Sequence, residues 1–464
     1  MNKRQLCRLG VPEDCVNVCI NIIRDGRLRN LVKKSQIKKI IPQILADPES
    51  YKVDLLWGDF AISLIQHARL EQEDDRREPV HLSVWGDDID EATLSQMQLA
   101  CKLPVAYGAA LMPDGHVGYG LSIGGVLATL NDVVPYGVGV DIACRMRLTV
   151  IDLDGETLET QLEKYRLALE KGTLFGIGKK WQNNKNHAVM DKNWNVTPIT
   201  KSVKDLAWEQ LGSSGSGNHF VEFGTLKVVS ELPTLEKNHT YVALLSHSGS
   251  RGPGMKVCQY YTKIAEERLP KRYHKFKKLA WLSMDSHEGQ SYWEAMRLMG
   301  QYAAANHDII HRDVIKLIGG CPIFTVENHH NFAFKEYHQN QNMIVHRKGA
   351  TPAGEGVLGI IPGSMADPGF VVRGKGCPES FDSASHGAGR TMSRKAAKNS
   401  FSWKEWKKEL NRRGVTLLSG GIDEVPGAYK SINDVMNAQQ DLVTIMAMFR
   451  PKIVKMSADA DARD

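Results

Sequence analysis

Hydrophobic residues recur at helical spacing in the first part of the chain. Two runs carry this pattern: Val16, Ile20 and Ile23, and then Ile37, Ile40, Ile41 and Ile44. Spacings of three and four residues place such side chains on one face of a helix. The strongly charged stretch 71–78 closes this part and is predicted to be a linker. We therefore predict a helical N-terminal extension over residues 1–80 and a separate main domain over residues 81–464.

From residue 81 onward the pattern changes to short runs of β-branched and aromatic residues between glycine-rich turns. Such runs are typical of strands that end in tight turns. The predicted strands span residues 105–111, 146–153, 221–223, 226–229, 241–245, 323–326, 357–361 and 370–372.

Four longer segments between these strands have helical periodicity, at 92–102, 158–171, 255–269 and 288–317. Asp285 or Ser286 is expected to cap the last of them, with Glu288 in its first turn. Ser431 and Asp434 form a similar capping pattern before the final helix. Because helices and strands do not alternate regularly, the pattern argues against a doubly wound parallel sheet and predicts an α+β fold.

Composition adds only broad limits. Of the 464 residues 42% are hydrophobic and 24% charged, and the net charge of +6 tolerates a polyanionic partner without requiring one. No apolar run approaches the roughly 18 residues that cross a bilayer, and the N-terminus lacks the apolar core of a signal peptide. Eight dispersed cysteines without a CxxC pair suit a reducing compartment. We expect a cytoplasmic protein with no membrane partner.

The histidines provide the first candidate chemistry. His219, His247, His330 and His386 each lie in a polar cluster rich in Gly, Ser or Asn. A lone histidine in such a place is usually a hydrogen-bonded structural residue. Four of them in separate loops after strands favour one shared site, because loops on a rigid scaffold commonly carry catalytic groups.

A fifth cluster adds ligands for a metal. Asp141 and Cys144 are three residues apart in a glycine-rich turn and can point to one place. A thiolate can bridge two cations, and a set of Asp, Cys and His ligands suits Mn, Zn or Fe better than Mg or Ca. The alternative is a buried cysteine beside a turn aspartate, and D-x-x-C alone does not exclude it.

Two common nucleotide signatures are absent from the sequence. The chain has no G-x-x-x-x-G-K-[ST] loop, and no Asp-Gly pair has a lysine two residues earlier. A nucleotidyl transferase built on this chain therefore needs a nucleophile other than lysine. His386, in a glycine-rich loop, is the best candidate, because a neutral imidazole can attack phosphorus.

At this point the chain resembles the RtcB family of RNA ligases. The resemblance rests on a series of motifs in sequence order, together with the Gly124-Gly125 turn, and it runs from about residue 84 to 456. The motifs are MPDGHVGYG (112–120), GVDIAC (139–144), GSGNHFVE (215–222), HSGSRG (247–252), HN (330–331), RKGA (347–350), IPGSM (361–365), SHGAGR (385–390) and DEVPGAYK (423–430). It implies that residues 81–464 form an RtcB-like ligase domain, an α+β fold around a central β-sandwich.

The resemblance also implies a reaction. His386 would be guanylylated by GTP, the guanylate would pass to an RNA 3′-phosphate made from a 2′,3′-cyclic phosphate where needed, and a 5′-hydroxyl would then displace GMP. RNA is the implied partner, and an archease-like protein is the implied activator. Two Mn²⁺ ions would be bound, with Cys144 bridging them, by Asp141, Cys144, His219, His247 and His330. The nucleotide would contact Asn218, His219, Phe220, Val221, Glu222, His330, Asn331, Pro362, Gly363, Ser364, Met365, His386, Gly387, Ala388, Gly389, Tyr429 and Lys455.

The chain departs from the family pattern at several positions. Gly115 stands where Val is usual, Gly369 where Ser is usual, and Arg145 where Gly is usual. The match at Lys455 needs a one-residue gap. An arginine beside Cys144 would repel a second cation unless it is turned away or paired with a phosphate. Because arginine binds phosphate in a bidentate manner, we expect Arg145 to contact the RNA 3′-phosphate.

Two other functions stay open on the sequence alone. A dinuclear metal phosphoesterase acting on RNA phosphate ends would use the same metal ligands without needing His386. A non-catalytic paralogue that binds RNA ends would need neither the metal ligands nor His386. The three functions differ in whether the protein takes up guanylate covalently.

Overall fold

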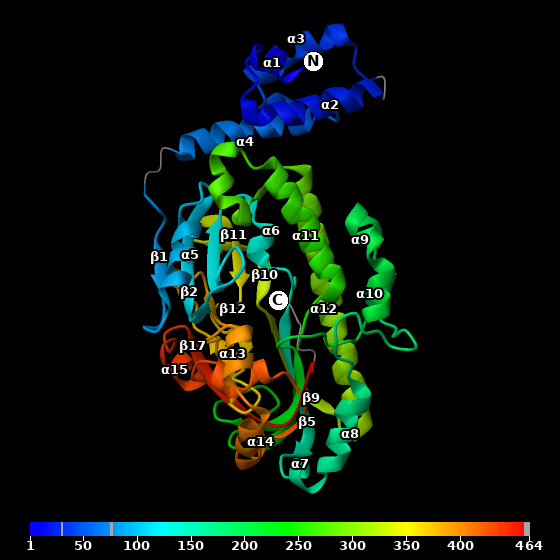
Figure 1. The fold of residues 1–464 in the computed structure, drawn as a ribbon, viewed down its shortest axis with the longest axis vertical. Coiled ribbons are helices and arrows are strands. Elements are labelled where there is room, and N and C mark those ends of the chain that lie inside the picture. Colours follow the sequence, from blue (N-terminus) through cyan, green and yellow to red (C-terminus); the bar gives the residue numbers. More distant parts are fainter. Residues whose placement is uncertain (29–30, 75–77, 459–464) are drawn as a thin grey trace.

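The computed structural model describes residues 1–28, 31–74 and 78–458. Its main body contains two large sheets and flanking helices, which confirms the α+β prediction (Figure 1). The smaller of these sheets has five strands in the order β1-β2-β3-β11-β10. These strands are β1 (Leu82–Val84), β2 (Ala106–His116), β3 (Ile123–Thr129), β11 (Gln341–Lys348) and β10 (Asn331–His338).

The larger sheet has eight strands and nearly closes on itself. Seven follow the order β13-β14-β17-β6-β7-β5-β9, and β16 pairs with β17. They are β13 (Leu358–Ile361), β14 (Gly369–Gly374), β17 (Val443–Met456), β6 (Phe220–Val228), β7 (Thr240–Ser248), β5 (Arg145–Asp154), β9 (Pro322–His329) and β16 (Thr416–Ser419). The side chain of Asn328 in β9 joins the two ends of this order, because it accepts from Ile360 N at 2.8 Å in β13 and donates to the carbonyl of the same residue at 3.3 Å.

One long helix, α12 (His287–Ile318), runs along the larger sheet (Figure 1). Its Ile310 and Val314 pack with Val242 and Leu244 of β7 in one hydrophobic cluster. Ser286 caps the helix by accepting from Gly289 N, so of the two predicted caps Ser286 is the one used. The helix thereby holds β7 and β5 in place, and both of these strands contribute to the candidate site.

Apart from α11, the remaining helices and strands of the main body are short. They are α5 (Glu91–Cys101), α6 (Pro135–Val138), α7 (Thr157–Thr160), α8 (Leu162–Gly172), α9 (Pro198–Ser202), α10 (Lys204–Gln210), α11 (Arg251–Arg268), α13 (Arg394–Ser400), α14 (Trp403–Arg412), α15 (Ile432–Asn437), β4 (Asp132–Val133), β8 (Leu282–Ser283), β12 (Ala350–Pro352) and β15 (Ser383–Ser385). No helix in the described ranges is long and apolar enough to cross a membrane.

The N-terminal residues form helices with a hydrophobic cluster of their own at one end of the molecule (Figure 1). The helices are α1 (Lys3–Cys7), α2 (Val16–Leu28), α3 (Lys34–Ala46) and α4 (Gly58–Asp74). The end of α4 meets the main body, where Leu70 joins its core and Arg69 forms an ion pair with Asp132 at 2.5 Å. Of the predicted linker 71–78, the first residues continue α4, and 75–77 lie outside the described residues.

Candidate active site

The five predicted metal ligands gather at one end of the larger sheet. Asp141 and Cys144 lie in the turn between α6 and β5, His219 directly precedes β6, and His330 lies between β9 and β10. His247 lies inside β7, next to its end, so the expectation that all these histidines follow strands in loops is wrong for His247 and His219. Pairing of β5, β6, β7 and β9 brings their ends together although they are far apart in the chain.

The ligand atoms form two groups of three that share one thiol. Sγ of Cys144 lies 3.1 Å from Nε2 of His247 and 3.3 Å from Nε2 of His219. On one side, His247 Nε2 is 3.1 Å from His330 Nε2; on the other, His219 Nε2 is 3.1 Å from Asp141 Oδ2. In each group the ligand atoms lie within 4.8 Å of one another. A single thiol shared by two groups of three ligands can bridge a pair of cations.

Backbone contacts hold these imidazoles in the form that binds metals. Nδ1 of His219 lies 2.7 Å from the Ser214 carbonyl, and Nδ1 of His247 lies 3.2 Å from the Asn218 carbonyl. Because a carbonyl only accepts, each Nδ1 carries the proton and each Nε2 offers its lone pair. Burial is the main reason why the pKa values of His247 and His330 fall well below the ordinary range, which keeps both rings neutral.

The two acidic ligands are the half-buried Asp141 and the buried Cys144, and their pKa values are shifted in opposite directions. Burial alone would raise the pKa of Asp141, but the adjacent His219 ring and the positive charge of Arg251 hold it below its ordinary value. Burial, together with the Asp141 carboxylate, raises the pKa of the Cys144 thiol well above its ordinary value. A cation that binds here must therefore displace the proton of the thiol.

His386 lies beside this cluster and is fixed by an aspartate. It follows β15, and its ring centroid is 4.9 Å from that of His330. Its Nδ1 lies 2.6 Å from Oδ2 of Asp114, which is fully buried in β2. Because a carboxylate only accepts, this contact places a proton on Nδ1, and in the neutral ring Nε2 then carries the lone pair that could attack. Gly389 has φ +73°, and a Cβ there would lie 2.3 Å from the Asp114 carbonyl, so the loop approaches Asp114 as closely as only glycine allows.

Asp114 is a functional candidate to which sequence analysis gave no role. It was part of a recognised motif, but it precedes His386 by 272 positions, and nothing local in the sequence pairs the two. One signal in the sequence could have identified Asp114: it is an aspartate in the Met-Pro-Asp-Gly-His segment to which no other role was assigned.

A large cleft of about 1520 Å³ contains the metal ligands, His386 and most of the predicted nucleotide contacts. Its volume exceeds that of a typical small-molecule site, about 300–1,000 Å³. The predicted nucleotide contacts that line it are Asn218, His219, Phe220, Glu222, His330, Asn331, Pro362, Gly363, Ser364, Met365, His386, Gly387, Ala388, Gly389 and Tyr429. The cleft is therefore large enough for more than one small-molecule ligand.

Two predicted nucleotide contacts, Val221 and Lys455, are not among the residues that line this cleft. They pair across β6 and β17, so both side chains lie on the same face of the sheet. Val221 is fully buried in the core on that face, and Lys455 donates to the carbonyls of Leu169, Glu170 and Thr173 at the end of α8. The alternation of side chains in a strand explains both positions.

Arg145 does not face the cleft, which contradicts the prediction that it contacts a phosphate. It is the first residue of β5, and the alternation of side chains along the strand places it on the face opposite to Met146, which lines the cleft. Its guanidinium donates to Glu327 at 2.9 Å and to the Gly300 carbonyl of α12 at 3.2 Å, and the residue is 8% exposed. The charge of Arg145 is therefore matched inside the protein, behind the metal ligands.

Comparison with known proteins is consistent with this geometry. The family model described as "tRNA-splicing ligase RtcB" matches residues 96–456. The chain is 31% identical to the RNA-splicing ligase RtcB of Escherichia coli K12, over 80% of this chain and 96% of that protein. It is 31% identical to the tRNA-splicing ligase RtcB of Nanoarchaeum equitans, over 79% and 91% of the two chains. An RtcB homologue of Entamoeba dispar is 28% identical, over 76% and 81%.

The family model covers well over half of the chain, and the matched residues include Asp141, Cys144, the four histidines and the partner aspartate Asp114. These are the residues that the structure gathers around the cleft. By this sequence match, the chain belongs to the RtcB family.

Proposed function

We propose that the protein is an RNA ligase that uses GTP and two Mn²⁺ ions to join an RNA 3′-phosphate, or a 2′,3′-cyclic phosphate, to a 5′-hydroxyl. In this proposal His386 is guanylylated during each reaction cycle. The observation that carries the proposal is the pair formed by Asp114 and His386, next to a cluster of metal ligands, in one cleft. A nucleophile, an orienting group and ligands for cations are the parts that phosphoryl transfer needs.

The residues present fit a pair of divalent cations. Asp141, Cys144 and His219 would hold one ion, and Cys144, His247 and His330 would hold the other. Thiolate, imidazole and carboxylate ligands together suit Mn²⁺ and exclude neither Zn²⁺ nor Fe²⁺. When bound, the cations would supply positive charge that neutralises phosphate oxygens during the reaction.

His386 performs the first step. Its Nε2 forms a bond to the α-phosphorus of GTP while the bond from that phosphorus to the bridging oxygen of pyrophosphate breaks. The imidazole becomes positively charged, and the Asp114 carboxylate, 2.6 Å from Nδ1, stabilises that charge. Because Asp114 is buried, this stabilisation acts where water does not screen it.

In the second step His386 is the leaving group, and in the third step the two RNAs are joined. An oxygen of the RNA 3′-phosphate attacks the phosphorus, the bond to Nε2 breaks, and His386 regains its neutral form. The 5′-hydroxyl oxygen of the second RNA then bonds to the phosphorus of the activated 3′-phosphate, its proton passes to water, and the bond from that phosphorus to the GMP oxygen breaks. The size of the cleft favours such a sequence, because two RNA ends and a guanylate must lie close together.

Covalent label uptake tests this proposal against the two alternatives. The protein is incubated with α-labelled GTP and Mn²⁺ and run on a denaturing gel. A ligase of this kind becomes labelled, whereas a phosphoesterase or an RNA-end-binding protein does not. Subsequent release of the label by an RNA with a 3′-phosphate, and not by one with a 3′-hydroxyl, identifies the acceptor end.

A further inference from the structure

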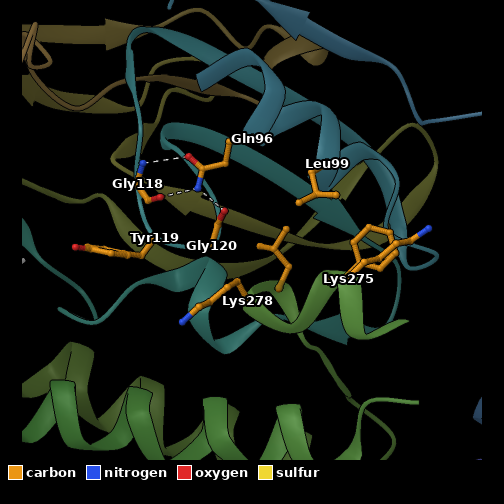
Figure 2. A pocket seen from close by; sticks show the side chains of 9 residues that line it. Gln96, Leu99, Gly118, Tyr119, Gly120, Lys275 and Lys278 are labelled. Carbon is orange, nitrogen blue, oxygen red and sulfur yellow. Dashed lines mark hydrogen bonds between the residues drawn. The ribbon is translucent and has the colours of Figure 1, made fainter. Parts of the chain in front are cut away.

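A short loop separates the cleft from a small hollow beside it. Residues 117–119 line the large cleft, while Gly118, Tyr119 and Gly120 also line a hollow of about 290 Å³. The opposite side of the hollow is formed by α5 and by the 3₁₀ helix Lys271–Leu279. Figure 2 shows the loop between these two elements, with Tyr119 and Lys278 projecting toward the same side. The loop is thus a wall that belongs to both spaces.

Side-chain hydrogen bonds fix the backbone of this loop. The amide of Gln96 donates to the carbonyls of Gly118 and Gly120, both at 2.6 Å, and accepts from Gly118 N at 3.1 Å (Figure 2). Lys348 donates to the Tyr119 carbonyl from the cleft side. Gly120 has φ +75°, and a Cβ there would lie 2.7 Å from the Lys278 carbonyl. The loop is therefore braced from three sides.

On this braced loop an aromatic ring is left exposed. Tyr119 is 63% exposed, so its ring is open to a ligand in the cleft that it lines. Two lysines lie near this loop: Lys348 donates to the Tyr119 carbonyl, and Lys278 lines the same hollow as Tyr119. Their ammonium groups lie 5.4 and 5.6 Å from the ring of Tyr136, which also lines the cleft. Lys278 is exposed and forms no ion pair with the residues that the structure describes.

We propose that Tyr119 and Lys278 form a platform for one unpaired nucleotide of the RNA, with its base stacked on Tyr119 and its phosphate beside Lys278. This inference rests on the proposed function, because it takes the cleft to hold RNA. Aromatic rings stack on any base, and an adjacent cation follows the backbone. Gln96 uses both ends of its amide on the loop, so it reads no base edge and the platform accepts any sequence. Gln96 is a positioning residue for the platform.

The test is the fluorescence of 2-aminopurine, which falls when the base stacks on an aromatic ring. Single-stranded RNAs carry this base at the first, second or third nucleotide from a 3′-phosphate or from a 5′-hydroxyl, and are mixed with protein without GTP. We expect quenching at one of these positions with the wild-type protein and with Tyr119→Phe, and its loss with Tyr119→Ala. Tyr337→Ala is the matched control, since Tyr337 is a 66% exposed tyrosine on β10 away from the cleft lining.

The affinities measured in the same titration give a second readout. Tyr119→Ala should weaken RNA binding about 5- to 160-fold, the range for losing one stacked base. Lys278→Ala should lower the slope of log Kd against log salt by about 0.7, the value for one phosphate contact in a single strand. Lys277 lies on the same 3₁₀ helix as Lys278 but is paired with Glu266 at 3.3 Å. Lys277→Ala should therefore change the slope less than Lys278→Ala does.

No quenching at any position with the wild-type protein, or equal quenching with Tyr119→Ala, would overturn the platform. Either result leaves guanylate uptake by His386 untouched, because that assay contains no RNA. Conversely, a protein that takes up no guanylate but still quenches through Tyr119 would contradict the proposed reaction and keep the platform. Melting temperatures of all variants confirm that each binding change occurs in folded protein.

Discussion

One carboxylate oxygen of Asp114 holds the loop that carries His386. Oδ2 accepts from Nδ1 of His386 at 2.6 Å, from the backbone N of His386 at 3.1 Å and from Gly387 N at 3.3 Å. The same atom therefore sets the tautomer of the ring, its orientation and the path of the loop. Because Asp114 is fully buried, it acts on the reaction only through His386.

Asp114→Asn should slow guanylate uptake strongly without preventing folding. The amide keeps the size of the carboxylate but removes the charge that stabilises the imidazolium. Losses on the order of 10²- to 10⁴-fold are expected by analogy with other carboxylate–histidine pairs. The rate of label uptake measures the effect, and Asp191→Asn, on an exposed aspartate, is the control. A rate within two- to three-fold of wild type would show that Asp114 only shapes the loop.

The metal ligands should behave as a unit. Cys144→Ser replaces the thiol shared by both triads with a much poorer ligand, so both cations should be lost along with activity. Metal content of the purified protein, by elemental analysis, is the measurement. Cys101→Ser changes a buried cysteine of the hydrophobic core and should keep its metal. Two full equivalents of Mn²⁺ in Cys144→Ser would rule out the bridging role.

Arg145→Met should reduce stability while the folded enzyme keeps its RNA chemistry. The change breaks an ion pair behind the site in which Arg145 is buried but Glu327 is 35% exposed and also lies 3.7 Å from Arg147. The expected cost lies between that of an exposed pair, about 1 kcal/mol, and that of a buried one, about 3 kcal/mol. Urea unfolding gives the stability change, and joining of a 3′-phosphate RNA to a 5′-hydroxyl RNA gives the activity. Unchanged stability combined with loss of joining would restore Arg145 as a substrate contact.

The N-terminal extension should be dispensable for guanylate uptake. We propose a boundary near residue 80, because the first helices have their own core and lie away from the cleft lining. A chain beginning at His81 loses Leu70 from the main core, so its free energy of unfolding should fall by about the cost of one buried leucine, about 2–5 kcal/mol. Leu70→Ala in the full chain isolates that contribution. A folded, truncated protein that takes up no label would place the extension in the active unit.

The sequence predicts elements well where one pattern runs uninterrupted. The strand predicted at 146–153 is β5, Arg145–Asp154, and the long helix predicted at 288–317 is α12. The sequence pattern did not predict β17, the longest of the described strands. Arg450 and Pro451 interrupt the apolar pattern of this strand, and its register shifts after Pro451. The two strands predicted at 221–229 are one, β6.

The residue types that form the site were easier to predict than the directions in which individual side chains point. Residue type and order drew attention to Cys144 and the histidines, and their individual roles came from the resemblance to the RtcB family. Which face a strand residue occupies depends on pairing between distant strands, which local patterns do not specify. For that reason Arg145 and Lys455 were expected in the cleft, although β5 and β17 turn them away from it.

The most direct test of the central claim is label uptake by His386→Ala. The variant is incubated with α-labelled GTP and Mn²⁺, denatured and run on a gel, next to wild type and His274→Ala, a histidine on the 3₁₀ helix outside the cleft. We expect wild type and His274→Ala to carry an acid-labile guanylate, and His386→Ala to carry none while keeping its Mn²⁺ content. A covalent guanylate on His386→Ala would contradict the assignment of the nucleophile.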